Sequence, residues 1–383
     1  MGYLRQGTLR SAKAGGLCLL VASLTIGCTR ATPSQVSYVG PRIEGVREIV
    51  LVNEEGTGEI KLFESIPKLR PILAWAPDGK RVVVQREEDE AFYLSDIEEK
   101  KLVRCLTCGL ADAFQADWSP DGEAIAFIAQ TGVYLARADD PELTQVSSLL
   151  DPLAIAWSPD SKSLAIGIWD QGLDLYRTDL AIEETVRLTR CHEQGMSCFS
   201  PEWSPDGQLI AFHSMDSSGF HLSVINPDGS GFRTIVDWDY KGEFFEPDAF
   251  SPPRWSPDGQ QLAFESLSPF GDTDVFVVSV DGSQLRNLSN YPGGDFDPVW
   301  SPDGSQLAFV STRDGNREIY VMDASGTNQV NVSKRPWTDE GAPAWRPVPR
   351  ETSAWWAYIA GGAALLTLLV IGGLALRRRR GST

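Results

Sequence analysis

The chain has 383 residues, of which 42% are hydrophobic and 22% charged, and its formal net charge is −18. This composition is typical of a folded protein and excludes an intrinsically disordered one. Eight of the 34 basic residues lie in the two ends, which hold no acid, so residues 31–376 carry a charge of −26. So acidic a body repels nucleic acid, and we expect no nucleic-acid partner.

Residues 1–27 have the features of an export signal. Basic residues precede the apolar run "GGLCLLVASLTIG", which at about thirteen residues is too short to span a bilayer. The segment "LTIGC" that ends this run resembles a bacterial lipobox, so we expect Cys28 to be lipidated after cleavage and residues 28–34 to form a linker. Thr25 stands where the lipobox usually has leucine, and ordinary cleavage near Cys28 is the alternative.

The motif W-S-P-D-G-x-x-L/I-A-F and close variants of it recur along the chain. The tryptophans of the seven copies lie 39 to 52 residues apart, and they are Trp75, Trp118, Trp157, Trp203, Trp255, Trp300 and Trp345. Each full copy begins a series of about four short strands, a period that indicates the blades of a β-propeller. We expect the tryptophans to be structural and to pack between neighbouring blades.

The Ser-Pro-Asp-Gly segment of the motif predicts a bulged hairpin turn. Proline presets φ, aspartate suits the next position, and glycine takes the left-handed position. Ser161 replaces the glycine in one copy, at a cost on the order of 1 kcal/mol if positive φ is kept. Prolines two residues before the tryptophan indicate sheet edges that line the propeller axis, and they are Pro201, Pro253, Pro298 and Pro343.

Over residues 35–348 this pattern resembles the WD40-like β-propeller repeat of the TolB family, the exported component of the Tol system. The segment "RDGNREIYVMDASGTN" at 313–328 belongs to the same repeat class, which also occurs in prolyl oligopeptidase-like peptidases. The resemblance implies that "APAW" at 342–345 adds a first strand to three strands expected between residues 35 and 65. We therefore expect an all-β, seven-bladed propeller, and six blades, the number in TolB itself, is the alternative.

Four cysteines within the propeller form two close pairs, Cys105 with Cys108 and Cys191 with Cys198. Two local pairs in an exported chain predict two disulfides. A zinc site that combines these thiols with His192 is the alternative. No HExxH, P-loop or EF-hand pattern is present, so we expect neither a metal nor another cofactor.

The C-terminal end predicts a membrane anchor. Residues 349–356 are interpreted as a juxtamembrane linker, 357–376 as an uncharged transmembrane helix, and 377–383 as a basic cytoplasmic tail. A buried core helix and a removable C-terminal sorting signal are the alternatives. We expect the propeller to lie on the periplasmic or extracellular side of a bacterial cytoplasmic membrane.

The loops opposite the Ser-Pro-Asp-Gly turns differ between repeats, whereas the turns themselves do not. Variable loops on a rigid scaffold are where function is usually found. The longest insertion, 237–253, combines aromatic and acidic side chains. Our partner-binding candidates on this face are Trp238, Tyr240, Phe244, Phe245, Trp169, Trp337 and Asp339. The alternative is a loop that folds its own aromatic side chains over the scaffold.

We expect no catalytic residue. A peptidase of the related class needs a G-x-S-x-G elbow and roughly 200 further residues, and three histidines without a spacing signature name no general base. The expected function is a non-catalytic protein–protein interaction scaffold for envelope or secreted proteins, held at the membrane by the C-terminal helix and an N-terminal lipid. The alternatives are a glycan or small-ligand receptor that uses the channel mouth, and a propeller hydrolase or lyase with a loop-borne site.

Overall fold

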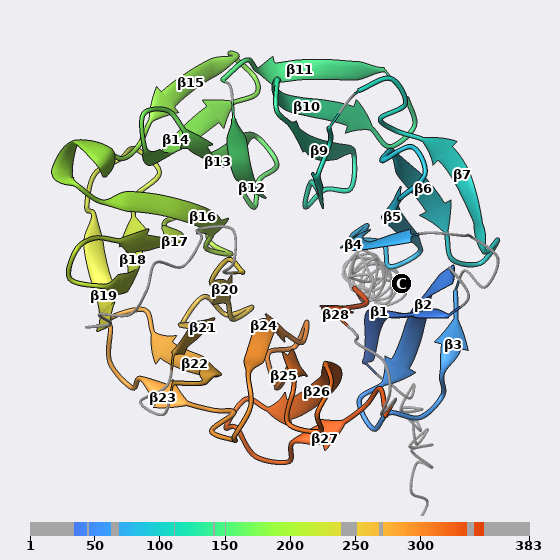
Figure 1. Cartoon of the computed structure of the whole chain (residues 1–383). Helices are drawn as coiled ribbons and strands as arrows, with labels where there is room; N and C mark the ends of the chain where they lie inside the picture. The colour runs from blue at the N-terminus through green and yellow to red at the C-terminus, as the bar shows by residue number, and fades with distance from the viewer. Residues whose placement is uncertain are drawn as a thin grey trace, which may run out of the picture. The chain divides into compact units, whose positions relative to one another are not determined.

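A computed structural model describes residues 34–43, 46–62, 69–110, 112–140, 142–149, 151–238, 251–267, 271–334 and 341–347. They belong to one compact unit that begins at Ser34. Seven four-stranded antiparallel sheets stand around a common axis (Figure 1). The expectation of a seven-bladed propeller is confirmed, and the alternative of six blades is wrong.

Six blades consist of four consecutive strands each. The first two are β4 (Leu69–Trp75), β5 (Arg81–Arg86), β6 (Phe92–Asp96), β7 (Lys101–Cys105), and β8 (Gln115–Trp118), β9 (Ala124–Ala129), β10 (Gly132–Arg137), β11 (Leu143–Ser147). The next two are β12 (Pro152–Trp157), β13 (Ser163–Trp169), β14 (Leu173–Asp179), β15 (Glu184–Arg187), and β16 (Ser197–Trp203), β17 (Ile210–Met215), β18 (Phe220–Ile225), β19 (Arg233–Trp238). The last two are β20 (Arg254–Trp255), β21 (Gln261–Leu267), β22 (Thr273–Ser279), β23 (Arg286–Asn287), and β24 (Asp295–Trp300), β25 (Gln306–Ser311), β26 (Glu318–Asp323), β27 (Val330–Asn331). A short 3₁₀ helix, η1 (His192–Gln194), precedes β16.

The seventh blade joins the two ends of the propeller. Its inner strand is β28 (Gly341–Trp345), and its outer strands are β1 (Gln35–Ile43), β2 (Val46–Asn53) and β3 (Ile60–Lys61). Val36 pairs with Trp345 and Ser37 with Ala344 across the joint. The ring is therefore closed by backbone hydrogen bonds between distant segments, as the family resemblance implied.

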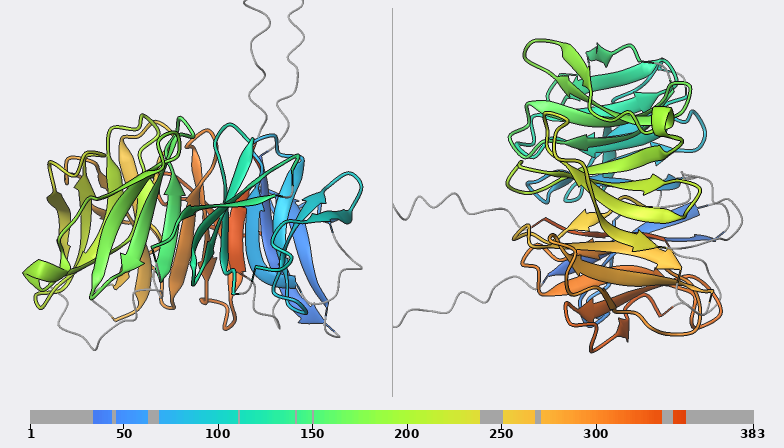
Figure 2. Two further views of the ribbon diagram at one scale, coloured as in Figure 1. Left: turned by 90° about the horizontal axis from the view of Figure 1, so that it is seen from above. Right: turned by 90° about the vertical axis from the view of Figure 1, so that its left-hand side faces the viewer.

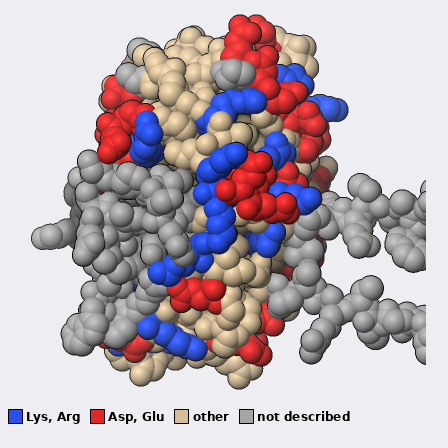
Figure 3. Space-filling model, turned by 90° about the vertical axis from the view of Figure 1, so that its right-hand side faces the viewer, with Lys and Arg blue, Asp and Glu red and all other residues tan. Residues whose placement is uncertain are grey.

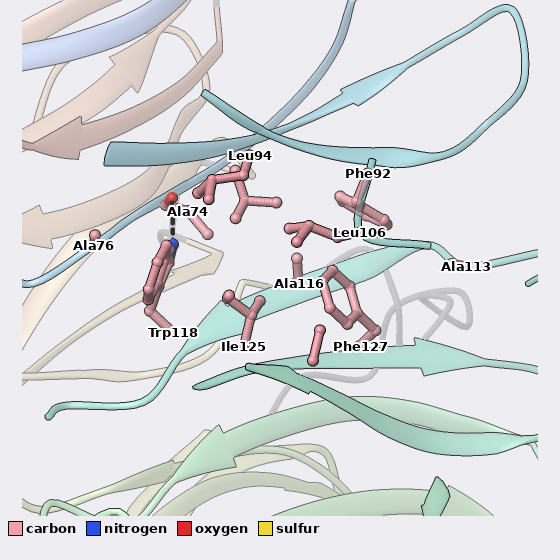
Figure 4. Packing of buried hydrophobic residues seen from close by; sticks show 12 residues of the cluster. Ala74, Ala76, Phe92, Leu94, Leu106, Ala113, Ala116, Trp118, Ile125 and Phe127 are labelled. Atoms are coloured by element: carbon pink, nitrogen blue, oxygen red, sulfur yellow. Dashed lines mark hydrogen bonds between the residues drawn. The ribbon is translucent and has the colours of Figure 1, made fainter. Parts of the chain in front are cut away.

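Each motif tryptophan packs between two blades, and most of them also donate a hydrogen bond to the preceding blade. Trp118 Nε1 donates to the carbonyl oxygen of Ala74 at 3.1 Å, among apolar side chains from both blades (Figure 4). The same bond, at 3.0 to 3.2 Å, joins Trp157 to Asp117, Trp255 to Glu202, Trp300 to Arg254, and Trp345 to Val299. The structural role predicted for these tryptophans is consistent with this geometry.

Two of the seven tryptophans depart from that rule. Trp75 Nε1 donates instead to Ser37 Oγ at 2.8 Å, and Ser37 Oγ donates to the Ala344 carbonyl oxygen at 2.9 Å. A serine from the N-terminal strand thus relays the bond across the closing blade. Trp203 Nε1 is buried and has no hydrogen-bond partner among the described residues.

The Ser-Pro-Asp-Gly turns have the expected conformation. In the turn before β25, Ser301 Oγ donates to Asp303 Oδ1 at 2.7 Å and accepts the Gln306 N–H at 3.0 Å, and Gly304 has a φ of 73°. Ser161 keeps positive φ, at 60°. Its hydroxyl accepts the Asp121 N–H of the neighbouring blade at 3.1 Å, a hydrogen bond that offsets part of the conformational cost.

The predicted signal, linkers, transmembrane helix and basic tail lie outside the described residues, apart from Ser34 at the end of the first linker. Within the part of the chain that the structure describes, no helix has the length and apolar character needed to cross a bilayer.

Replacing Trp300 by Phe should destabilise the propeller more than replacing Trp203 by Phe. Both side chains are half-buried, but only Trp300 donates a hydrogen bond between blades. We expect the free energy of unfolding to fall by about 1 kcal/mol more in Trp300→Phe, measured by guanidinium denaturation. Equal losses in the two variants would contradict an energetic role for the inter-blade bond.

Candidate functional site

The ring has two ends, between which the strands run (Figure 2). One end, called here the turn end, carries the Ser-Pro-Asp-Gly turns together with the turns between third and fourth strands, as the bond from Leu180 N to the Lys162 carbonyl shows. The other, called the loop end, carries the loops between second and third strands and the connections between blades. Arg346 Nε donates to the Gly79 carbonyl oxygen at 2.8 Å, so the chain leaves β28 at the turn end.

The loop end exposes three large apolar side chains on neighbouring blades. Trp169, at the end of β13, is 53% exposed, and Phe114, just before β8, and Leu153, the second residue of β12, are each 38% exposed. Backbone bonds connect the segments that carry them, because Trp169 N donates to the Asp151 carbonyl oxygen, Asp151 N to that of Gln130, and Phe114 N to that of Ile128. Sequence reasoning selected Trp169 and missed its two neighbours.

The other candidates for partner binding do not join this group in the described structure. Trp238, at the end of β19, packs edge-to-face on Phe276 of the next blade, with 4.8 Å between ring centroids, and is half-buried in the core there. Much of its surface is therefore committed to the scaffold. The remaining candidates, Tyr240, Phe244, Phe245, Trp337 and Asp339, lie outside the described residues.

A second candidate group, of charged side chains, lies on the inner strands near the turn end. In five of the seven copies the residue before the tryptophan uses its carbonyl oxygen for the inter-blade bond, so the residues at this repeat position form one layer around the axis. Most are small and apolar, but three of them are Asp117, Glu202 and Arg254. Asp117 and Glu202 face a cavity that is also lined by Trp118, Pro120, Ala156, Trp157, Pro159, Trp203, Ser204 and Pro205.

The charges in this layer are coupled. Burial and then repulsion by Glu202 raise the pKa of Asp117 to about 7, although Arg254 acts in the opposite direction. Burial likewise raises the pKa of Glu202, whose Oε2 lies 3.6 Å from Arg254 Nη1. Two carboxyl groups thus face the same cavity, and the Arg254 guanidinium lies beside one of them. Sequence reasoning missed these residues, and the signal was their charge at a repeat position where other copies have Ala or Val.

The cavity lies at the junction where, among the described residues, Trp203 makes no hydrogen bond to the preceding blade. The unpartnered Trp203 forms part of its wall, next to Ala156, whose carbonyl oxygen is the equivalent of the acceptors used by the other tryptophans. The junction between the β12–β15 and β16–β19 blades therefore lacks the bond that fixes five other junctions directly. A departure from the repeat and a cavity thus occur at the same junction.

A further buried acid holds the chain where it re-enters the ring after the insertion. Glu265 accepts N–H bonds from Ser251 at 3.0 Å and Asp297 at 2.8 Å. Burial and then the neighbouring Asp297 raise the pKa of Glu265 to about 7. Because the carboxylate is enclosed by backbone donors, we interpret this acid as structural.

The four propeller cysteines form the two predicted disulfides, Cys105–Cys108 and Cys191–Cys198. The zinc alternative is therefore wrong, because these thiols are bonded to each other. His192 Nδ1 lies 2.5 Å from Asp174 Oδ2. No group of three or more metal-ligating side chains occurs in the described ranges.

The three histidines lie away from the cavity. His192 pairs with Asp174, His213 Nε2 lies 3.1 Å from the Ser251 carbonyl oxygen, and His221 Nε2 lies 3.2 Å from Asp216 Oδ1. None of them is among the residues that line the cavity in the described structure. The titratable groups that line the cavity are therefore the carboxyl groups of Asp117 and Glu202.

Sequence comparison finds related proteins. The TolB β-propeller domain family (PD40) matches residues 245–347. An uncharacterized protein of Agrobacterium fabrum is 28% identical over 257 residues, which cover 62% of this chain and 82% of that protein. The Tol-Pal system protein TolB of Gluconobacter oxydans is 42% identical over 72 residues, 19% of this chain and 14% of that protein. The match with this TolB thus spans well under two thirds of its length.

Several solved structures have a similar fold. TolB from Acinetobacter baumannii has a TM-score of 0.52 at 16% identity, with 82% of this chain and 66% of that one covered. A puromycin-hydrolyzing peptidase of Mycobacterium tuberculosis reaches 0.62 at 15% identity, with 79% and 51% covered. An oligogalacturonate lyase in complex with manganese reaches 0.55 at 16% identity, with 79% and 85% covered. At these identities the likeness shows the fold alone.

Replacing Asp117 by Asn should remove a pH dependence of stability. Because folding raises the pKa of Asp117 from 3.8 to about 7, the folded state binds more protons between these values and becomes less stable as the pH rises through them. We expect Asp117→Asn to melt higher than the natural chain at pH 8, with the difference shrinking towards pH 4. Glu184→Gln, which alters an exposed acid, is the control, and a difference that is constant with pH would contradict the assignment.

Proposed function

Because the chain belongs to the TolB-like β-propeller family, we propose that it is a non-catalytic scaffold for protein–protein interactions in the bacterial cell envelope. One of its relatives is named as a Tol-Pal system protein, which supports envelope proteins as the class of partner. The export signal, the lipidation of Cys28 and the C-terminal helix that we predict from the sequence would support a membrane-tethered location.

The observation that carries the proposal is the exposed apolar group at the loop end, Trp169 with Phe114 and Leu153. Exposed aromatic and aliphatic side chains that lie together are typical of the centre of a protein interface. Trp169 pairs with Leu173 in the β13–β14 hairpin, and its N–H donates to the Asp151 carbonyl oxygen, so its backbone is already ordered before a partner binds. This group is the contact surface that we propose.

An exposed acidic residue lies within two positions of each member of the apolar group in the sequence. These residues are Asp112 for Phe114, Asp151 for Leu153 and Asp170 for Trp169. This arrangement favours a partner whose contact surface has an apolar centre and a basic rim. By contrast, on the side of the ring that carries β6 and β7, acidic and basic side chains lie next to each other (Figure 3), as in the pair Lys101–Glu99.

Trp169→Ala should abolish recovery of the partner from membranes without changing stability. Loss of an exposed aromatic anchor costs about 2 kcal/mol of binding free energy, or roughly thirtyfold in Kd. We suggest crosslinking in intact cells followed by affinity purification of the full chain, with the melting temperature measured in parallel.

The matched control is Ile182→Ala. Ile182 is 65% exposed and lies in the β14–β15 turn of the same blade, but at the turn end. This variant should recover the partner normally. Loss of the partner in Ile182→Ala but not in Trp169→Ala would place the contact surface at the turn end and contradict the proposal.

The cavity favours a second function, that of a receptor for a small cationic ligand. Asp117 and Glu202 line it together, and one of them titrates near neutral pH. We expect putrescine, an aliphatic diamine, to raise the melting temperature of the natural chain by mass action. The neutral analogue 1,4-butanediol should have no effect, and Asp117→Asn should remove the effect of putrescine. An equal shift in this variant would contradict a site in the cavity.

The hydrolase or lyase alternative has support only at the level of fold. The peptidase and the lyase named above share the propeller architecture with this chain. Function resides in specific sites and not in the fold, and we assign no catalytic role to any residue described here.

A further inference from the structure

We propose that the Cys105–Cys108 disulfide is a thiol–disulfide exchange site for a protein dithiol, whereas Cys191–Cys198 is a permanent structural bond. The two disulfides differ in their surroundings. Cys108 is exposed and Cys105 half-buried, while Cys191 and Cys198 are only 2% and 0% exposed. An attacking thiolate must reach a sulfur atom along the S–S axis, so exposure decides which of the two bonds can be attacked.

Open space next to Cys108 allows a partner to approach. The following residue, Gly109, has a φ of +93°, and a Cβ placed on it would meet no atom within 4 Å. Cys108 itself lies in a turn that is closed by the bond from Leu110 N to the Thr107 carbonyl oxygen at 3.0 Å. The sulfur that a partner reaches first is therefore that of Cys108.

The backbone around this pair is held independently of the S–S bond. Leu106 is buried in the core between the β4–β7 and β8–β11 blades, and its N–H donates to the Phe92 carbonyl oxygen at 2.8 Å. Thr107 Oγ1 accepts the Phe92 N–H at 2.9 Å. The reduced form therefore keeps the fold, and the cysteines remain close enough to reoxidise.

The other disulfide is part of the core. Cys191 and Cys198 both belong to the apolar cluster between the β12–β15 and β16–β19 blades. The Cys191 N–H also donates to the buried carboxylate of Asp174 at 2.6 Å. The Cys191–Cys198 disulfide closes a longer loop than the Cys105–Cys108 disulfide. Its reduction would therefore increase the entropy of the unfolded chain by more.

Polar groups lie next to Cys108, which leaves as a thiolate in the second step of the exchange described below. Tyr93 Oη lies 4.0 Å from Cys108 Sγ, and Arg86 Nη2 donates to Tyr93 Oη at 2.6 Å. Burial and the hydrogen bond that its hydroxyl donates to Asp89 Oδ2 raise the pKa of Tyr93, so the hydroxyl is protonated at neutral pH and its hydrogen is held by Asp89. The group that can favour a thiolate here is the Arg86 cation, which is shared with Asp89.

The exchange takes place in two steps. A thiolate of the partner attacks Cys108 Sγ, the S–S bond breaks, and its electron pair leaves on Cys105 Sγ. The partner's second thiolate then attacks the partner sulfur of the mixed disulfide and releases Cys108 as a thiolate. The partner dithiol loses two electrons and two protons and becomes a disulfide, and Cys105 and Cys108 take up the two electrons and two protons as thiols.

The first test compares the two disulfides in the same molecule. The full chain is treated with N-ethylmaleimide to block free thiols, reduced with limiting dithiothreitol, and labelled with iodoacetamide, and each cysteine is followed by peptide mass spectrometry. We expect Cys105 and Cys108 to be labelled at least about tenfold faster than Cys191 and Cys198. Equal rates, or faster opening of Cys191–Cys198, would overturn the proposal.

The second test uses a protein dithiol. Thioredoxin whose resolving cysteine has been replaced by serine should form a stable mixed disulfide with Cys108. The adduct should persist in a Cys191→Ala/Cys198→Ala double variant if that variant folds, and disappear in Cys105→Ala/Cys108→Ala, whose melting temperature should change little. Absence of the adduct from the natural chain, or its attachment to Cys191 or Cys198, would refute exchange at Cys108.

Discussion

The hydrogen bond from the motif tryptophan of one blade to a carbonyl oxygen of the blade before it is the contact on which the ring depends. A buried indole N–H needs an acceptor, and only a correctly placed neighbouring blade supplies one. Five tryptophans bond in this way, and Trp75 reaches Ala344 through Ser37 of the N-terminal strand. Ring closure therefore uses the same interaction as the packing of consecutive blades.

This interaction also organises the chemistry near the axis. It sets the residue before each tryptophan at one level, so a charge at that repeat position meets charges from other blades. Asp117, Glu202 and Arg254 are brought together in this way, and the cavity lies where the bond of Trp203 is missing. The loop end is free of this constraint, and there the blades present different side chains, such as the exposed Trp169.

Several features of the candidate sites followed from local chemistry. The disulfides were predictable because each pair is close in the sequence, and the exposure of Trp169 followed from its position at the end of a second strand. The partial burial of Trp238 was not predictable, because it depends on packing against Phe276 in the next blade. The pKa of Asp117 depends on burial and on Glu202, which lies two blades further along the chain.

The number of blades and the form of their turns could be derived from the sequence, and the resemblance to the TolB repeat implied how the ring closes. The blades and turns depend on a short motif that recurs every 39 to 52 residues, so their cause is local. Only the tertiary structure decided which acids are coupled near the axis, which aromatic side chains remain exposed, and which disulfide a partner can reach. These properties depend on distances between blades that are far apart in the sequence, and burial and electrostatic coupling arise only when the ring closes.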